Sequence, residues 1–338
     1  MVVFVLFLTV LIGFAALAID TGSWFLEKRR AQAAAAAGAL AAASALPTSN
    51  QAALDAATAA ADDNMGDSVL VSGGGHAAPE VQTTVEINHG APSRVTVSVS
   101  THAGAVFARL FGIERVDVAA HATAEVGSYR AWAWNLAPWA IDQPSLPPYG
   151  THVDVKYPPG SQVAPGNFGA VDLPIDTSAA CPEPPGANVY RDVIARRLDT
   201  CGVTIGQTLP TETGNMSGPT AQGLTARGAQ QGYDWHRAVT STGTGSYAIN
   251  DESNPNVIVI PIIDAWSNGK STVKVLGFAT FVITGWSSSG GGKNANTSIQ
   301  GVFIRTSLSP HDCPGQPGGA CPLGGYDPNG FTGIRLVS

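Results

Sequence analysis

Hydrophobic residues run without a charge through the first 19 positions of the chain, and the first charged residue is Asp20. About 20 apolar residues in a helix cross a bilayer core, so this run is long enough to span a membrane. A cleavable secretory signal peptide is the alternative, because the small residues of "AALAI" resemble a cleavage site. The run has no basic segment before it, which a signal peptide requires, and we expect a retained membrane anchor.

A helix-forming tract, and no turn, follows the apolar run. Alanine occupies 11 of the 15 positions from Ala31 to Ala45, and the first proline is Pro47. Because alanine has the highest helix propensity, the sequence predicts one helix that continues from the apolar run to Ala45. Small side chains let helices approach closely. We expect the face that carries Ala35 and Ala42 to pack against other subunits, since the tract has no large apolar stripe to hold a core.

Four charged residues mark the expected membrane boundary: Asp20, Lys28, Arg29 and Arg30. The positive-inside rule, applied literally, places the three basic residues in the cytoplasm. The cysteines further along the chain favour the opposite orientation, because disulfides persist outside the cytoplasm. We expect a single-pass protein whose chain is extracytoplasmic after Asp20.

Residues 47–128 have the pattern of a small α+β unit. Residues 49–64 predict a short helix with Ser49 or Asn50 as its N-cap. Apolar and polar residues alternate in "VQTTVEI", "VTVSVS" and "VDVAAHATAEV", which predicts three strands. Between the second and third strands, "AGAVFARLFGI" predicts a short helix with Phe107, Leu110 and Phe111 on one face.

Residues 129–338 predict a mainly β domain. "VIVIPIID", "VKVLGFATFVITGW" and "SIQGVFIRTSL" are rich in β-branched residues, and Asn268-Gly269 between the first two is a hairpin signal. A helix is expected over residues 188–199, with Gly202 near its C-cap. The expected fold class is therefore α+β, divided into a helix over 1–46, a small α+β unit over 47–128 and a disulfide-containing β domain over 129–338.

Composition excludes some classes of partner. Charged residues make up 13% of the 338 residues and the net charge is −7, which argues against nucleic-acid binding. The four cysteines allow three connectivities, and proximity favours Cys181–Cys201 and Cys313–Cys321. A zinc site that includes His311 is the rival interpretation, but the spacing fits no common zinc motif. We expect two disulfides and no cofactor or metal.

Motifs for catalysis are incomplete. "GKS" at residues 269–271 lacks the first glycine of a phosphate-binding loop, because Asp264 occupies that position. "DTSAA" at Asp176 has Ala180 where an Asp-x-Ser-x-Ser metal site has its second serine. A Ser/His/Asp site dispersed along the chain leaves no motif, so that alternative stays open here. We expect that the chain is not an enzyme and has no small-molecule substrate.

The N-terminal motif "GFAALAIDTGSWFLEKRRAQAAAAAGALAAASALP" resembles the signature of the TadE/TadG-like proteins of Flp (Tad) pilus assembly. "AVFARLFGIERVDVAAHATAEVG" is similar to the unit that follows in this family. "APWAI", "PGNFGAVDL", "GNMSGPTAQGL" and "VIPIID…VLGFATFVI…IQGVFI" are similar to the ectodomain of its longer members.

The resemblance implies a membrane-anchored, pilin-like accessory or assembly component of an adhesive pilus. Its implied partners are the membrane, other pilus subunits and proteins of the Tad machinery. The alternative function is a cell-surface adhesin that binds carbohydrate or protein through exposed tryptophans. The candidates are Trp132, Trp134, Trp139, Trp235 and Trp266. Core packing is the favoured interpretation of these tryptophans.

Overall fold

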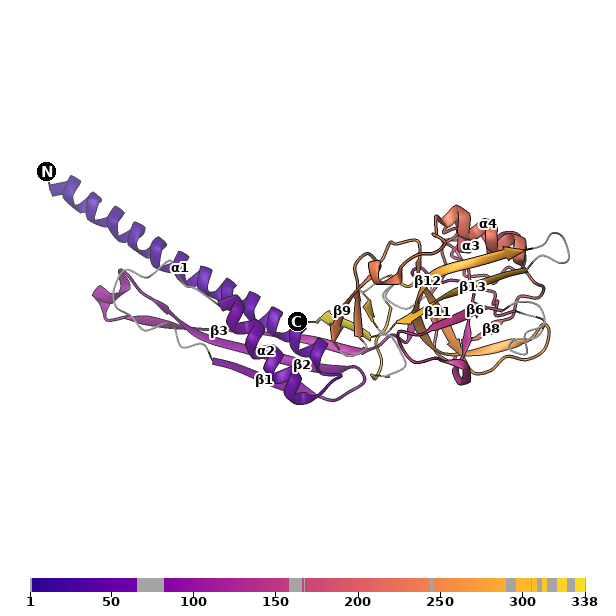
Figure 1. Ribbon diagram of the computed structural model, residues 1–338. Helices are drawn as coiled ribbons and strands as arrows, with labels where there is room; N and C mark the ends of the chain where they lie inside the picture. The colour runs from indigo at the N-terminus through magenta and orange to yellow at the C-terminus, as the bar shows by residue number, and fades with distance from the viewer. Residues whose placement is uncertain are drawn as a thin grey trace. The chain divides into compact units, whose positions relative to one another are not determined.

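The computed structural model describes residues 2–65, 82–157, 166, 168–243, 246–289, 296–304, 306–308, 312–314, 321–326 and 332–337. The chain forms two compact units (Figure 1). Unit 1 contains Met1–Val126 and Ile334–Ser338, and unit 2 contains Gly127–Gly333.

A single helix, α1 (Val2–Ala45), opens unit 1. Its 44 residues correspond to about 66 Å at 1.5 Å per residue. The helix ends before Pro47, which has no N–H to continue the hydrogen-bond ladder. The predicted continuous helix is thus confirmed. Within the residues that the structure describes, no helix combines the length and the hydropathy needed to cross a membrane.

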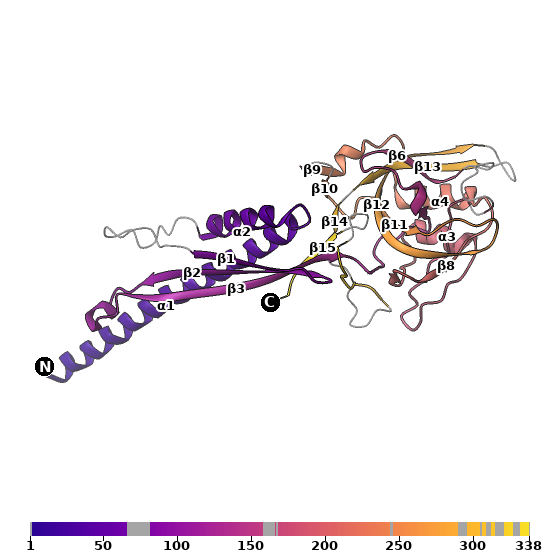
Figure 2. The same ribbon diagram turned by 90° about the horizontal axis from the view of Figure 1, so that it is seen from below.

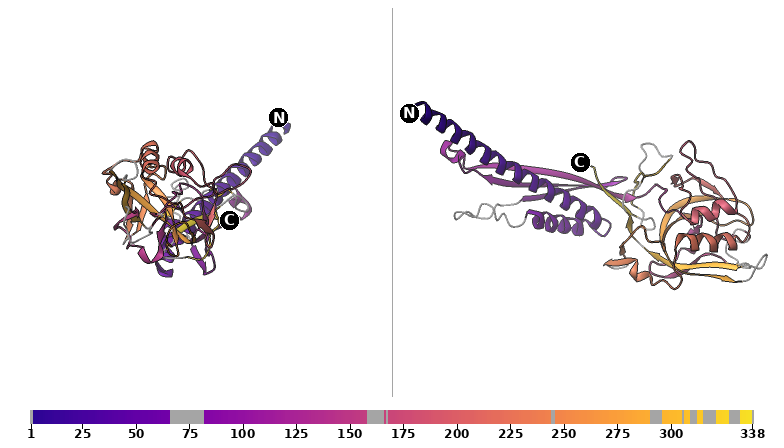
Figure 3. Two further views of the ribbon diagram at one scale, coloured as in Figure 1. Left: turned by 90° about the vertical axis from the view of Figure 1, so that its right-hand side faces the viewer. Right: turned by 90° about the horizontal axis from the view of Figure 1, so that it is seen from above.

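A second helix, α2 (Asn50–Met65), lies beside α1 (Figure 3). The Ser49 hydroxyl accepts a hydrogen bond from the Ala52 N–H at 3.0 Å, so Ser49 is an N-cap as predicted. The side chains that α2 buries recur every four residues, which places them on one face. They are Ala53, Ala57, Ala61 and Met65.

The two helices cover one face of an antiparallel sheet. Its strands are β1 (Gln82–Asn88), β2 (Ser93–Gly104) and β3 (Arg115–Ser128), with β15 (Thr332–Leu336) next to β3. Figure 2 shows β2 and β3 as one long hairpin, and the turn η2 (Ala108–Phe111) lies at its tip. The strands predicted from alternation are confirmed, but the predicted helix between them is only this single 3₁₀ turn.

The alanine face of α1 is covered by the chain itself. Ala35 and Ala42 are fully buried, and they belong to one apolar cluster with α2 and with the inward valines of β2. A Cβ atom at Gly38 would lie 3.0 Å from the Ala57 carbonyl oxygen, so the two backbones are very close. The tight packing expected of an Ala-rich helix is present. The expectation that partner subunits cover this face is wrong, because α2 and β2 occupy it.

Unit 2 is built on a sheet in the strand order β5-β11-β12-β13-β6. The central strands are β11 (Val257–Ile263), β12 (Thr272–Ser289) and β13 (Asn296–Ile304), and the outer ones are β5 (Ile141–Asp142) and β6 (His152–Lys156). β11 and β12 pair antiparallel across Asn268-Gly269, so the predicted hairpin is confirmed, although its loop is longer than a two-residue turn.

Shorter elements complete unit 2. β8 (Thr208–Pro210) extends the pairing of β12, and two small sheets join β4 (Ala131–Trp132) with β7 (Val203–Thr204) and β9 (Val239–Gly243) with β10 (Ser246–Ile249). β14 (Ser307–Leu308) pairs parallel with the start of β15. The remaining turns are η3 (Gln143–Ser145) and η4 (Trp235–Arg237).

Helices α3 (Ala187–Ile194) and α4 (Ser217–Arg227) pack together on one face of the large sheet. α3 stops five residues before the predicted end at Asp199, because Arg196 adopts a positive φ of 55°. Gly202 is therefore not the C-cap. A Cβ atom at Gly223 would lie 2.7 Å from Ile194 Cβ, so only glycine allows this helix contact.

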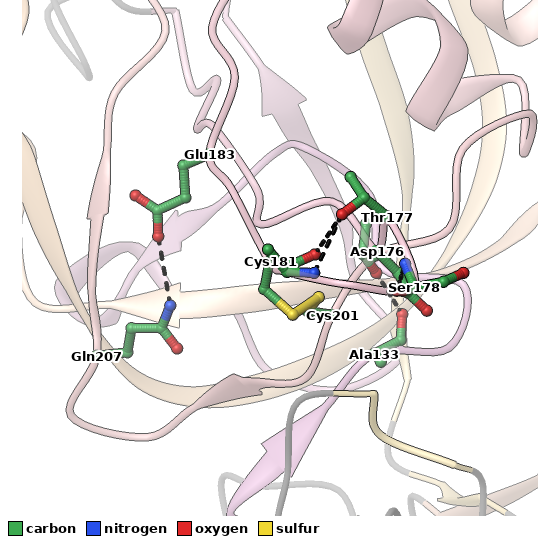
Figure 4. Close-up of a disulfide and its surroundings, with 10 residues drawn as sticks. Ala133, Asp176, Thr177, Ser178, Cys181, Glu183, Cys201 and Gln207 are labelled. Atoms are coloured by element: carbon green, nitrogen blue, oxygen red, sulfur yellow. Dashed lines mark hydrogen bonds between the residues drawn. A yellow bond between two sulfur atoms is a disulfide. The ribbon is translucent and has the colours of Figure 1, made fainter.

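Two disulfides close loops of unit 2, and both predicted pairs are confirmed: Cys181–Cys201 and Cys313–Cys321. Figure 4 shows the first bridge beside a turn in which the Ser178 N–H donates to Asp176 Oδ1 at 2.7 Å. The bridge joins the two ends of the segment that contains α3. All four cysteines are paired, and His311, which the rival zinc interpretation included, lies outside the described residues.

A buried pair of carboxyl groups lies elsewhere in unit 2. Burial and the hydrogen-bonded neighbour Glu212 raise the pKa of Asp172 to about 8, and Glu183 adds to this while Lys270 opposes it. Glu212 also accepts a hydrogen bond from the Gly186 N–H at 3.0 Å. The pair is therefore most stable when it shares a proton.

We predict that Ala35→Leu destabilises unit 1. The added atoms have no space against α2 and β2, and overpacking of this kind costs about 1–3 kcal/mol. Ala33→Leu is the matched control, because Ala33 is exposed on the same helix. Thermal unfolding and hydrogen exchange of the α2 amides measure the effect. Equal stability of the two variants would contradict the packing described here.

We also predict that Asp172→Asn changes the pH dependence of stability. The folded pKa of Asp172 lies above its unfolded value of about 4, so its contribution is complete below pH 4 and is lost as the pH rises through about 8. The stability of the variant relative to the wild type, measured as the difference in Tm, should therefore rise as the pH rises from about 4 to about 8. Asp62→Asn, at an exposed position of α2, should follow the wild type. A pH-independent difference for Asp172→Asn would refute the shift.

Candidate functional site on the first helix

Polar side chains at a spacing of four residues join α1 to the β2–β3 hairpin. Residues four apart lie on one face of a helix, so these side chains form a line along α1. We call this line the α1 seam; it consists of Asp20, Trp24, Lys28 and Gln32. The last three donate hydrogen bonds to backbone carbonyls of the hairpin, whereas Asp20 accepts hydrogen bonds. Each contact thus uses a backbone group of the hairpin, independent of its side chains.

The contacts of the seam progress along the hairpin. Trp24 Nε1 donates to the Gly104 carbonyl at 3.3 Å, close to the end of β2. Lys28 Nζ donates to the carbonyl of Ala119, and Gln32 Nε2 donates to the carbonyl of His121 at 3.0 Å, both on β3. Carbonyls two residues apart on β3 therefore meet side chains that are one helical turn apart.

Asp20 forms the strongest part of the seam. The side chain is 2% exposed, and its carboxylate accepts hydrogen bonds from the N–H groups of Val106 (2.8 Å), Phe107 (3.0 Å) and Ala108 (2.6 Å). These N–H groups open the turn η2, where a helical turn leaves its first donors without internal partners. Burial raises the pKa of Asp20, but the three backbone donors outweigh it and hold the pKa below its usual range.

The other expected boundary residues have local roles. Arg29 lies over the Phe25 ring, with its guanidinium carbon 5.0 Å from the ring centroid, and Arg30 forms an ion pair with Glu27 at 3.7 Å. Lys28 and Asp20 instead belong to the α1 seam. Sequence reasoning missed the roles of Trp24 and Gln32, although the spacing of four residues from Asp20 was a signal that could have found them.

The turn at the hairpin tip presents apolar side chains to solvent. Leu110 is 83% exposed and Phe111 is 86% exposed, so neither packs into the core as a buried helix face would. Val106 and Ile113 on either side are also exposed. Gly112, with φ of 82°, ends the turn and allows the chain to enter β3.

A second polar cluster secures the other part of the sheet in unit 1. Glu125 on β3 is buried and accepts two hydrogen bonds each from Arg94 on β2 and Arg335 on β15, at 2.7–3.0 Å. Burial raises the pKa of Glu125, and the two guanidinium groups more than offset this, so the pKa lies below its usual range. The cluster holds the C-terminal strand in the sheet.

The tryptophans considered for ligand binding divide into two groups. Trp132 and Trp139 are fully buried in the core of unit 2. Trp134, Trp235 and Trp266 are only partly buried. The Trp235 ring packs against the ring of exposed His236, with ring centroids 4.0 Å apart and ring planes tilted by 32°.

Unit 2 also has a pocket of about 330 Å³, which is lined by residues that include Trp134, Arg196 and Arg227. Both arginines donate to backbone carbonyls and to Asn135 Oδ1, so these hydrogen bonds hold their guanidinium groups in the fold. Among the described residues, no group of three or more His, Cys, Asp or Glu side chains is placed to hold a metal ion.

Comparisons with known proteins relate to α1 alone. Residues 1–45 match the family model described as "Putative Flp pilus-assembly TadE/G-like". Comparison with curated proteins and with solved structures gives no match. The matched segment contains every residue that α1 contributes to the seam and to the alanine face. The first 45 residues of this chain are therefore similar to the Flp pilus-assembly TadE/G-like family, in agreement with the motif in the sequence.

Proposed function

We propose that the chain is a membrane-anchored, pilin-like accessory or assembly component of a Tad (Flp) pilus. The observation that carries this proposal is the match of residues 1–45 to the pilus-assembly family model. Within this segment, Asp20 and the seam hold a β hairpin while the alanine face holds α2. The matched helix is thus the scaffold of unit 1, and a structural role in an assembly suits it better than catalysis.

The membrane anchor is part of this proposal. Its support is the uncharged run from Met1 to Ile19, in which several side chains are exposed on the isolated chain, such as Phe4, Phe7 and Phe14. An extracytoplasmic location after Asp20 is supported by the two disulfides, because oxidising compartments favour such bonds. The chain then is a single-pass protein at the cell surface, or a subunit of the pilus itself.

The outer face of α1 is the surface that we assign to pilus partners. The inner face is occupied by α2 and β2, whereas Phe25, Leu26 and Leu40 remain exposed. These side chains lie beyond the uncharged run, so a bilayer does not cover them all. Apolar residues on an otherwise polar helix face are typical anchors for a neighbouring helix. The proposed partners are other pilus subunits or proteins of the Tad machinery.

A cell-surface adhesin is the second candidate function. It is favoured by Trp235 and His236, which form an aromatic pair at the surface of unit 2. Aromatic platforms bind the apolar faces of ligands, including sugars. The adhesin role and the assembly role are compatible in one protein, but the pair has no match that names a ligand.

We predict that a reporter fused after Pro47 is active only outside the cytoplasm. A periplasmic enzyme such as alkaline phosphatase should be active at this position, and a cytoplasmic reporter should be inactive. The same pair of reporters fused to a chain without residues 2–19 is the control and should show the reverse result. Activity of the cytoplasmic reporter alone at Pro47 would overturn the anchor, its orientation and the extracytoplasmic location.

We predict that Leu26→Asp combined with Leu40→Asp abolishes co-purification with sheared pilus fibres or with the assembly machinery. Both side chains are exposed, so the folded chain should melt as the wild type does. The matched control is Thr58→Asp with Ala59→Asp, which adds the same two charges to the exposed face of α2. Normal co-purification of the Leu26/Leu40 variant would contradict the assignment of the outer face of α1 as the partner surface. Failure of the wild-type chain to co-purify would argue against the pilus role.

A further inference from the structure

The tip of the β2–β3 hairpin is an apolar patch without a core to join. We define the hairpin tip as residues 105–113. Within it, Val106, Leu110, Phe111 and Ile113 are exposed, and two of them retain more than 80% of their accessible surface. Large side chains this exposed on a single turn are unfavourable in water. Clustered apolar exposure of this kind marks a surface that meets a membrane or another protein.

Asp20 fixes the position of this patch along α1. Three N–H groups of the hairpin tip bind the Asp20 carboxylate, and Trp24 binds the next carbonyl of the hairpin. Asp20 is also the first charged residue after the uncharged run. The hairpin tip therefore lies at the level where the apolar run of α1 ends. Figures 1 and 2 show α1 continuing past the hairpin tip toward its N-terminus.

Exposed apolar side chains also lie on α1 shortly before Asp20. On α1, Phe14, Leu17 and Ile19 are exposed next to Asp20 in sequence, and the hairpin tip adds Leu110 and Phe111 at the same level. If the uncharged run of α1 lies in the bilayer, its end lies at the membrane surface. The hairpin tip is held at that end, so its apolar side chains are placed to contact lipid. Interfacial segments bury apolar side chains at the headgroup–acyl boundary in this way.

The charges around the hairpin tip suit the headgroup layer. Arg109 and Arg115 are exposed on the tip and at the start of β3, and Lys28 and Arg29 are exposed on α1. The acidic residues among them are Glu27, Glu114 and Asp117. Trp24, half-buried in the seam, lies where aromatic residues gather in membrane proteins. Basic residues near a bilayer surface favour anionic headgroups.

We propose that the hairpin tip inserts Leu110 and Phe111 into the interfacial layer of the bilayer beside α1, as a second membrane contact of the chain. This inference rests on the membrane anchor in the proposed function. A second protein copy is the other occupant that such a patch could have. The lipid surface is favoured because Asp20 holds the tip at the end of the uncharged run.

The test uses the full chain reconstituted in vesicles of phosphatidylcholine with phosphatidylglycerol. Because all four native cysteines are paired, Leu110→Cys provides a single site for an environment-sensitive fluorophore. Glu86→Cys, at an exposed position of β1, is the matched control. We expect the probe at position 110 to be quenched by nitroxide-labelled lipid and to be several-fold less accessible to iodide than the probe at position 86. Adding Asp20→Asn should reduce this protection.

The outcomes separate this inference from the proposed function. Equal iodide quenching at positions 110 and 86, in vesicles from which carbonate does not extract the chain, overturns the inserted tip and leaves the anchor intact. Protection of position 110 that depends on protein concentration, without quenching by labelled lipid, assigns the patch to a second copy and overturns the inference. Extraction of the wild-type chain by carbonate overturns both the anchor and the inserted tip.

Discussion

The hydrogen bonds of the Asp20 carboxylate are the interaction on which unit 1 depends. They join residues that are 86 to 88 positions apart in sequence, and they connect a helix to the tip of a hairpin. The donors are backbone N–H groups at the start of a turn, which are left without intrahelical partners. One side chain thereby completes the turn and sets the register between α1 and the sheet.

The alanine face adds a steric constraint to this polar one. Ala35, Ala39 and Ala42 are fully buried and place only methyl groups between α1 and its neighbours, and Gly38 lets the α2 backbone come close. Such close packing fixes the rotation of α1 about its axis, because turning it would place larger side chains against α2. The α1 seam and the alanine face therefore fix the same rotation of α1 relative to α2 and the sheet. The outer face of α1 is exposed as a result.

Local patterns predicted much of this fold, whereas long-range partners were not visible in the sequence. The N-cap at Ser49, the strands of the hairpin and the two disulfides followed from residue type and spacing. The role of Asp20 could not be predicted in this way, because its partners are backbone N–H groups, and the residue types in "AVFAR" do not indicate which N–H groups lack a partner. The cover of Ala35 could have been inferred from Ala53, Ala57 and Ala61, whose spacing of four residues makes a matching face on α2. The early end of α3 at Ile194 goes with the positive φ of Arg196, and no sequence motif predicts that backbone angle.

The chemistry of the acceptor explains why a carboxylate occupies position 20. A carboxylate has about four acceptor sites and no donor, so it can face three N–H groups at once. An asparagine at this position would turn an NH₂ donor toward some of the same N–H groups, and a lysine or arginine could accept none. Burial alone would raise the pKa of Asp20 and favour the neutral carboxyl group. The pKa is lowered instead, because the hydrogen bonds from the three backbone N–H groups outweigh the effect of burial. The charge at the end of the apolar run is thus required by the hairpin, independently of any membrane that surrounds the helix.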